Sequence, residues 1–438
     1  MKHRYYIFLL LGFIVSCDNS TTPKLRTDSG FDVFVEDVHA SEAWLEIKVG
    51  TTNISRDITL NFDSLPDSVM SLSIKNDTII HLEELNPLLT YSISCNLAET
   101  TDFQASQKEV NFTTMDTTSH EFEWSYWEFG DYASSYLSDI TIIDENNIWA
   151  VGNVHLFDST GAQDPKRYNL LHWDGNEWTT HKQTVKFRGN DILTPFYGIS
   201  SFDAEKVWVA SGLPIEKKSY GWSLHDIRDY FGPDVYCNIV HTVSSEQLYF
   251  GGKNGNLVSL TGVYWKQLNP GTDLHFYDIW GDYNDEFDEY EVLTISGNYL
   301  KTNEVKIYSV TSTDANEIAS QGIEESIGGI WFSSNSKYYV VGSGIHTKHT
   351  LDEKLWKKMN GPTIYRLYDI QGENVNNIFT CGAFGEIVHF NGKSWKSYRE
   401  SGVYPNQYKF KKIDYKDDLV AIVGSDSFNS VIILGRKM

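Results

Sequence analysis

The sequence predicts an all-β protein with two kinds of domain, and three observations lead to this prediction. Between residues 31 and 114, short runs of alternating apolar and polar residues are separated by polar turns, as in half-buried strands. Beyond Trp124 a longer unit recurs, and several copies contain turns typical of tight hairpins. At 438 residues the chain is also longer than a chain that usually folds around a single hydrophobic core.

The first residues predict export. A basic start precedes an apolar run at 5–15, which is too short to span a membrane but fits a signal peptide. The run ends in Ile-Val-Ser-Cys, which resembles the lipobox of bacterial lipoproteins and implies that Cys17 carries lipid. An ordinary signal peptide with a chance cysteine is the alternative. We expect a signal at 1–17, a polar tether at 18–30 and an anchor in the inner or outer membrane of the bacterial cell envelope.

The amino-acid composition limits the classes of partner that the protein is expected to bind. The chain has 36 basic and 59 acidic residues, a net charge of −23, and no basic run, so it would repel nucleic acid. We interpret the aromatic content of 14% as sheet packing, with surfaces that stack on sugars or peptides as the alternative. Cys95, Cys237 and Cys381 lie far apart without metal-site spacing, so we expect buried thiols.

A β-sandwich is predicted for residues 31–115, with strands at 31–35, 43–49, 91–94 and 110–114. The segment Leu-Asn-Pro-Leu-Leu-Thr-Tyr, which ends at Tyr91, resembles the fibronectin type III segment that leads into the tyrosine corner. Trp44 occupies the early core-strand position of that family. The resemblance implies that Tyr91 caps a backbone group at the sandwich corner and does no chemistry.

The repeated unit starts with an aliphatic residue, continues through a polar turn and ends in glycine twelve residues later. Four copies keep this spacing: Ile140 and Gly152, Val240 and Gly252, Ile330 and Gly342, Ile370 and Gly382. Looser copies start at Ile199, Ile279 and Ile413, which makes seven units.

A second signature follows in several units, a turn and then a tryptophan, at Trp178, Trp265 and Trp395. Asp-Gly and Asn-Gly turns suit two-residue hairpins, so each unit should hold four strands. Four-stranded units that recur seven times along the chain predict a seven-bladed β-propeller over residues 121–438. The units are similar to sialidase-type and photosystem-assembly-type repeats, and to kelch repeats only at Gly251-Gly252, but they lack a full Asp-box and the WD40 signature.

The last unit lacks a fourth strand, because the chain ends in the apolar run 430–434. The sequence Tyr-Trp-Glu-Phe at 126–129 resembles the outer-strand sequence Tyr-Trp-Lys-Gln at 264–267. We therefore expect residues 121–129 to supply the missing outer strand, so that the two ends of the propeller pair.

Long loops are expected at 153–167, 179–195 and 397–407, on the face where each inner strand begins. The linker should enter from the opposite face, so that these loops point away from the membrane. Function concentrates on such loops, and we select Tyr168, Arg188 and Tyr398 as candidate binding residues.

Three carboxylates are candidates for the central channel. Asp139, Asp278 and Asp369 each precede the aliphatic residue of a unit, and Tyr277 and Tyr368 precede two of them. Clustered carboxylates suit a cation or a cationic ligand group. The alternative is that they hydrogen-bond neighbouring backbone or face channel water.

The sequence favours a binding protein. Motifs of nucleotide, metal and serine catalysis are missing from the sequence. The acidic run 282–289 resembles half of a calcium loop but lacks its glycine, so we expect a solvated loop and no cofactor, with calcium as the alternative.

We expect a lipid-anchored monomer that binds an extracytoplasmic protein or glycan with the long-loop face. The alternatives are a propeller glycoside hydrolase or lyase that uses acidic residues on the same face, and an envelope assembly factor.

Overall fold

The computed structural model describes residues 30–50, 54–63, 69–99, 104–298 and 304–438. Cys17, the expected signal and the tether before residue 30 lie outside the described residues. Within these ranges no helix is long and apolar enough to cross a membrane. The chain divides into two compact units: the first ends at Thr118 and also takes Asn391–Ser394, and the second comprises Ser119–Phe390 and Trp395–Met438.

The first unit consists of two antiparallel sheets around one core. One sheet has the order β1-β2-β5, with β1 Asp32–Val38, β2 Ala43–Lys48 and β5 Thr78–Leu82. The other has the order β4-β3-β6-β7, with β3 Arg56–Phe62, β4 Val69–Ile74, β6 Thr90–Leu97 and β7 Ser106–Thr113. Strands therefore occur at all four expected places.

Two aromatic residues of this unit have different roles. Tyr91 is buried in the core, and its hydroxyl accepts a 2.8 Å hydrogen bond from the backbone N–H of Asn86. This contact is the expected backbone cap. Trp44 points to the other side of β2 from Leu45 and Ile47, which are core residues, and it stacks on His81 with ring centroids 4.5 Å apart. Trp44 is thus buried on an early strand, as expected, but it packs outside the aliphatic core cluster.

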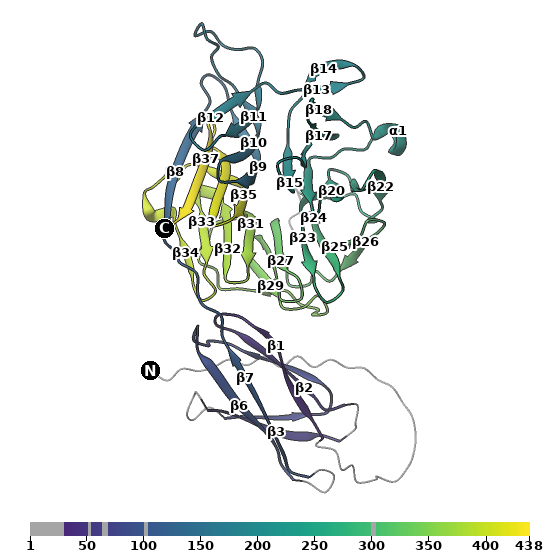
Figure 1. Ribbon diagram of the computed structural model, residues 1–438, viewed down its shortest axis with the longest axis vertical. Coiled ribbons are helices and arrows are strands. Elements are labelled where there is room, and N and C mark those ends of the chain that lie inside the picture. The colour runs from purple at the N-terminus through teal and green to yellow at the C-terminus, as the bar shows by residue number, and fades with distance from the viewer. Residues whose placement is uncertain (1–29, 51–53, 64–68, 100–103, 299–303) are drawn as a thin grey trace. The chain divides into compact units, whose positions relative to one another are not determined.

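The second unit contains seven sheets in its described residues, six of four strands and one of six (Figure 1). Sheet 1 is β9 Tyr136–Asp144, β10 Asn147–Val154, β11 Tyr168–Trp173 and β12 Trp178–His181. Sheet 2 is β15 Gly198–Ser201, β16 Val207–Ala210, β17 Pro214–Lys218 and β18 Gly221–Leu224, extended by β13 Thr184–Phe187 and β14 Asn190–Leu193. Sheet 3 is β19 Ile239–Thr242, β20 Gln247–Gly251, β21 Leu257–Thr261 and β22 Tyr264–Leu268.

The remaining four sheets follow the same strand order. Sheet 4 is β23 His275–Asn284, β24 Glu289–Gly297, β25 Val305–Val310 and β26 Ala315–Ile318. Sheet 5 is β27 Ile327–Ser333, β28 Lys337–Gly342, β29 Gly344–Lys348 and β30 Lys357–Lys358. Sheet 6 is β31 Leu367–Asn374, β32 Asn377–Gly382, β33 Ile387–Phe390 and β34 Trp395–Ser397. Sheet 7 is β35 Lys409–Lys416, β36 Leu419–Ser425, β37 Ser430–Lys437 and β8 Phe122–Phe129.

In the described part of the chain, three short helical segments lie outside the sheets, namely α1 Arg228–Phe231, η1 Ala383–Gly385 and η2 Arg399–Ser401. Two segments differ from the expected loops. Residues 179–195 contain the hairpin β13–β14, which joins sheet 2 by parallel pairing of β13 with β18. Residues 282–284 and 289 of the acidic run lie in β23 and β24, and the exposed residues 285–288 form the turn of this hairpin.

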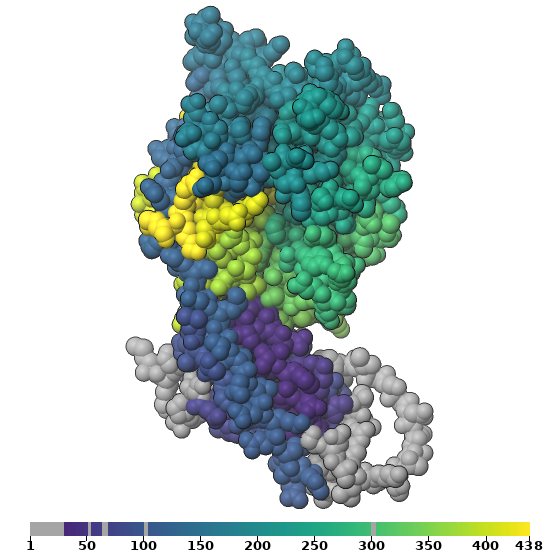
Figure 2. Space-filling model, in the orientation of Figure 1, coloured from purple at the N-terminus to yellow at the C-terminus, as the bar shows by residue number. Residues whose placement is uncertain are grey.

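The first strands of the sheets lie side by side. In order, β9, β15, β19, β23, β27, β31 and β35 each contact the next, and β35 contacts β9. Figure 1 shows these strands in the middle of the unit and the outer strands β8, β12, β22, β26 and β34 around them. Seven clusters of buried apolar side chains lie between the sheets, each combining residues of two neighbours. The space-filling view shows side chains closing the gaps between the ribbons (Figure 2).

The repeated glycine has a steric cause. It stands near the end of the second strand, where the start of the first strand crosses closely. A Cβ at Gly252 would lie 1.7 Å from the carbonyl oxygen of Tyr236, and one at Gly342 would lie 2.0 Å from that of Ser326. Any larger residue would push the two strands apart, which explains the regular spacing of glycine in the sequence.

The expected pairing of residues 121–129 with the C-terminal strand is present. Strand β8 pairs antiparallel with β37 from Phe122 opposite Lys437 to Phe129 opposite Ser430. On the face toward sheet 1, the ring of Trp127 lies 5.3 Å from that of Trp173. Tyr126, the preceding residue, points to the other face and is 43% exposed.

This packing can be tested with two neighbouring substitutions. Because Trp127 is half-buried between two sheets, Trp127→Ala should lower the free energy of unfolding by about 2 kcal/mol, measured by urea denaturation of the purified protein. The control Tyr126→Ala should stay within about 0.5 kcal/mol of the parent. Equal losses for both variants would contradict the packing of β8 against sheet 1.

Candidate functional site

The channel between the first strands is lined at one level by seven equivalent residues. Each directly precedes the aliphatic residue of its unit, and we call this place the inner position. The inner-position residues are Asp139, Gly198, Ile239, Asp278, Gly329, Asp369 and Lys412. The three carboxylates selected from the sequence thus lie at one level with a lysine that the sequence analysis did not select.

Lys412 supplies the cation for two of these carboxylates. Its Nζ donates to Oδ1 of Asp278 at 2.7 Å and to Oδ1 of Asp369 at 3.1 Å. The lysine belongs to sheet 7 and the two carboxylates to sheets 4 and 6, so the ammonium group reaches past sheet 5. Sheet 5 has Gly329 at the inner position, where a Cβ would lie only 2.9 Å from Oδ1 of Asp369.

The same carboxylates also hydrogen-bond to the backbone of a neighbouring sheet. The N–H of Ile199 donates to Asp139 at 2.8 Å, that of Ile330 to Asp278 at 2.9 Å, and that of Ile413 to Asp369 at 2.9 Å. Three further side chains of first strands accept from the next sheet: Ser200 from Thr242, His241 from Gly281, and Asp414 from Ile142. Among the described residues, six of the seven sheet junctions therefore share such a bond.

Burial and mutual charge set the protonation of this cluster. Burial raises the pKa of Asp139 to about 7, although the charge of Lys412 acts to lower it. Burial also opposes the charged form of Lys412, but the carboxylates outweigh it, led by Asp278 and Asp369, and its pKa rises well above the usual value. The side chain of Lys412 is 18% exposed, so channel water still reaches it. The ammonium group is charged and acts as the internal counterion.

A cavity of about 290 Å³ continues along the channel from this cluster toward the ends of the first strands. It is lined by polar and aromatic side chains, including Ser200, His241, Trp280, Gln371 and Asp414. Burial lowers the pKa of His241 to about 4, so the imidazole is neutral and its Nε2 accepts from Gly281. Polar groups of this kind suit water or a small polar molecule.

The other end of the channel is the mouth, where the first strands begin. Five of these strands, in the described chain, carry a β-bulge one residue before the inner position: Ser138, Tyr277, Gly328, Tyr368 and Lys411. A bulge redirects the side chain of the extra residue and is common beside functional sites. Tyr277 and Tyr368, both selected from the sequence, therefore stand at the mouth rather than beside the carboxylates.

Basic side chains lie over tyrosine rings at this mouth. Cation-to-centroid distances are 4.5 Å for Lys409 over Tyr368, 5.2 Å for Arg366 over Tyr368, 5.5 Å for Lys411 over Tyr136, 5.3 Å for Lys253 over Tyr236 and 4.7 Å for Arg399 over Tyr365. We call these five cations and four tyrosines the channel mouth. Cation–π contacts of this kind hold a charged side chain in place without neutralising it.

The other three candidate residues lie elsewhere. Tyr168 donates to Asp164 at 3.3 Å, with Lys182 over its ring. Arg188 is exposed on the β13–β14 turn and pairs with Asp226 at 2.8 Å. Tyr398 is only 4% exposed and donates to the carbonyl of His120 at 2.7 Å. The expectation that Tyr398 stands on a surface loop is therefore wrong, because its ring packs into the core between sheets 6 and 7.

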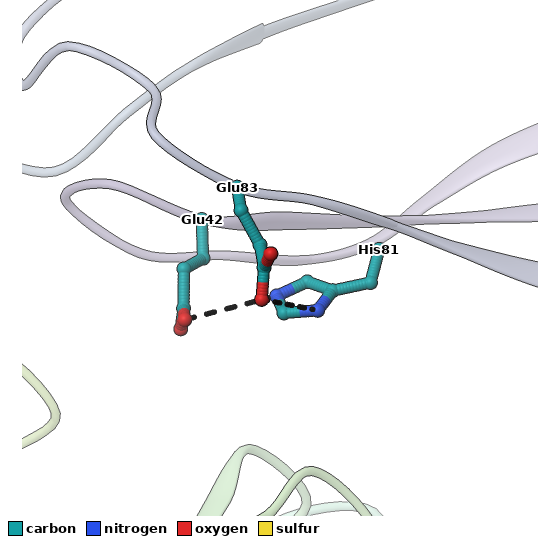
Figure 3. Close-up of side chains that lie close together, drawn as sticks. All are labelled: Glu42, His81 and Glu83. Atoms are coloured by element: carbon teal, nitrogen blue, oxygen red, sulfur yellow. Dashed lines mark ion pairs between the residues drawn. The ribbon is translucent and has the colours of Figure 1, made fainter. Parts of the chain in front are cut away.

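The described part of the chain has one group of three side chains placed for a shared metal ion, Glu42, His81 and Glu83 in the first unit (Figure 3). Nε2 of His81 lies 3.7 Å from Glu42, and its Nδ1 lies 3.4 Å from Glu83. Each ring nitrogen thus faces a different carboxylate. A metal ion would use one of the two nitrogens together with one oxygen of each carboxylate.

Sequence reasoning missed Lys412 and all five cations of the mouth. Lys412 had a usable signal, because it precedes Ile413 as the aspartates precede their aliphatic residues. The cations at 253, 366, 399 and 409 had none, because they are scattered through the sequence and meet only when the sheets assemble.

The role of Lys412 can be tested by Lys412→Met, which leaves two buried carboxylates without a counterion. The free energy of unfolding should fall by about 3 kcal/mol at pH 8. Without the nearby positive charge, the pKa of Asp139 rises further, so the folded variant keeps a proton that the unfolded chain has lost. Its stability then decreases with rising pH, and the deficit should be smaller at pH 5 than at pH 8.

Lys416→Met is the matched control, because Nζ of Lys416 also lines the cavity but donates only to the carbonyl of Ile143 at 2.8 Å. It should cost about 1 kcal/mol with no added pH dependence. A Lys412→Met deficit that is equal at both pH values would contradict the counterion role.

Comparisons with known proteins support the architecture. No family profile matches the sequence, and no curated protein matches it. Among solved structures, YCF48 bound to a D1 peptide has 13% identity and a TM-score of 0.53, covering 74% of this chain and 100% of that one. YCF48 from Cyanidioschyzon merolae has 13% identity and a TM-score of 0.50, covering 71% and 98%. The WD40 propeller domain of Doa1 has 11% identity and a TM-score of 0.50, covering 70% and 96%. At such identities the likeness shows the fold alone: this all-β chain contains a β-propeller.

Proposed function

We propose that this protein is a lipid-anchored scaffold of the bacterial envelope that binds another protein at its channel mouth. In this proposal the seven sheets are the blades of one ring, which β8 closes by completing the last blade. The sequence of contacts among the first strands and the β8–β37 pairing support the ring. The order of the strands in the first unit and the Tyr91 contact support a fibronectin type III domain.

One observation carries the binding role. In a chain of net charge −23, five cations gather over four tyrosines at the entrance of one channel. Structural needs alone do not explain this gathering, because the sheets are already joined by the inner-strand hydrogen bonds and the apolar clusters. Aromatic residues and arginine are enriched at the centres of protein interfaces. YCF48, a propeller of similar fold, has been solved with a peptide bound.

The hydrolase alternative finds less support in the site. A glycosidase needs two carboxylates that are free to exchange protons with the substrate. Asp278 and Asp369 are instead engaged by Lys412 and by backbone N–H groups. An assembly factor remains a form of the proposed binding role, since it also requires a protein partner.

The anchor is tested by Cys17→Ala. Without the cysteine no acyl chain can be attached, so the variant should leave the membrane fraction and appear in the soluble fraction of the envelope. Immunoblotting after carbonate washing measures the distribution. Membrane retention equal to the parent would contradict lipidation at Cys17.

The binding face is tested by photocrosslinking. A photoreactive phenylalanine derivative in place of Tyr368 should give one defined protein adduct in intact cells, because this position lies at the channel mouth. The matched control replaces Tyr264, which is 79% exposed on the outer strand β22. The same adducts from both positions, or none from position 368, would contradict binding at the mouth.

A further inference from the structure

We propose that the ligand of the channel mouth is an extended acidic peptide segment, in which glutamate or aspartate side chains alternate with apolar ones. This inference rests on the proposed function and specifies the chemistry of the partner. The mouth provides both fixed positive charge and exposed apolar surface, and a segment of this composition matches both.

Most cations of the mouth have no acidic partner. Within the described residues, Lys253, Arg366, Lys409 and Lys411 have no carboxylate oxygen within 4.0 Å. Of the five cations only Arg399 has an acidic partner, Glu400. Further carboxylates near the mouth are Glu304, in a depression that it shares with Tyr277 and Arg366, and the buried Glu386, which accepts hydrogen bonds from Thr363 and Ser397. These four cations therefore lack a direct carboxylate partner, and Lys253 and Lys409 are also exposed to an incoming anion.

Two of these charges also repel each other. Burial and the nearby charge of Lys409 both lower the pKa of Lys411. The cation–π contacts with Tyr136 and Tyr368 hold the two ammonium groups in place. Carboxylates bound between them would replace this repulsion with attraction and would meet side chains that are already ordered, which favours binding.

Exposed apolar side chains lie beside the cations of the mouth. Ile364 is 95% exposed and Phe384 is 59% exposed. Phe384 adopts a φ of +59°, a left-handed conformation that costs about 1 kcal/mol for a residue of this size. Hydrogen bonds hold its turn against two strands, from the N–H of Ala383 to Arg366 at 2.9 Å and from that of Gly385 to Tyr408 at 2.7 Å.

This combination favours a peptide over other anions. Acidic polysaccharides offer charge but no apolar side chains for Ile364 and Phe384, and nucleic acids offer bases that can stack on Phe384 but no aliphatic side chain for Ile364. A long polyanion would also extend over the acidic remainder of a chain with net charge −23. At physiological salt, fields are screened within roughly 8 Å, so a short segment feels chiefly the cations of the mouth.

The test uses amidated, fluorescein-labelled peptides of ten residues in which glutamates alternate with leucine and phenylalanine. Fluorescence anisotropy with the purified protein should show saturable binding that weakens as salt increases. A peptide with glutamine at every glutamate position should bind at least about tenfold more weakly. Equal binding of the two peptides would overturn the proposal.

Two charge-matched double variants locate the site. Lys253→Glu with Lys409→Glu reverses exposed cations at the mouth, and should weaken the acidic peptide at least about tenfold. The control, Lys266→Glu with Lys354→Glu, makes the same charge change at exposed positions elsewhere, and should stay within about twofold. Equal weakening by both would overturn the assignment to the mouth, because it would reflect net charge alone.

Three further probes decide between the sources of negative charge. A labelled poly-dT decamer, a short polygalacturonate and a neutral peptide with a free C-terminal carboxylate should each bind more weakly than the acidic peptide. Stronger binding of any of them would overturn the acidic segment. Photocrosslinked adducts from position 368 that survive the Lys253→Glu/Lys409→Glu change would overturn the acidic segment but leave the proposed protein-binding function intact. If the proposed function itself is wrong, position 368 gives no such adducts at all.

Discussion

The bonds that join the first strands through their side chains are the constraint on which the rest of the second unit depends. Seven strands that converge on one channel cannot pair with each other edge to edge, so their facing N–H groups need other acceptors. Aspartate, serine and histidine side chains provide them at six junctions, and Gly329 allows close approach at the seventh. This arrangement buries several carboxylates, which is energetically unfavourable, and the positive charge of Lys412 partly compensates for that burial.

Adjacent residues on the same strand have separate tasks. The inner position joins the sheets, as Asp369 does through Lys412 and Ile413. The residue before it is bulged, so Tyr368 leaves the regular alternation and stands at the mouth under Lys409 and Arg366. In the proposed function, a structural residue and a binding residue therefore follow each other directly in sequence. The same arrangement recurs where Lys411 precedes Lys412.

Much of the fold could be predicted, because its steric constraints require particular residue types at a fixed spacing in the sequence. Glycine recurs where a first strand crosses closely, and Trp127 marks a strand that packs as the other outer strands do. Contacts between distant strands could not be predicted, because no local sequence pattern indicates that Lys409 lies over Tyr368 or that Tyr398 donates to His120. The position of the aspartates before the aliphatic residue of their units predicted a channel site. Their partner Lys412 has the same position in the last unit, but a lysine does not fit the cation site that the carboxylates indicated.

We propose that the channel interior is structural and that the mouth is the binding surface. Amide hydrogen exchange of the protein with and without the acidic peptide tests both halves in one measurement. Exchange should slow at residues 364–368, 383–385 and 408–411, and should stay unchanged and slow at Ile142, Ile330 and Ile413, whose N–H groups are held by the inner carboxylates. Slowing confined to the cavity segments 200–202 and 414–416, with none at the mouth, would contradict the account.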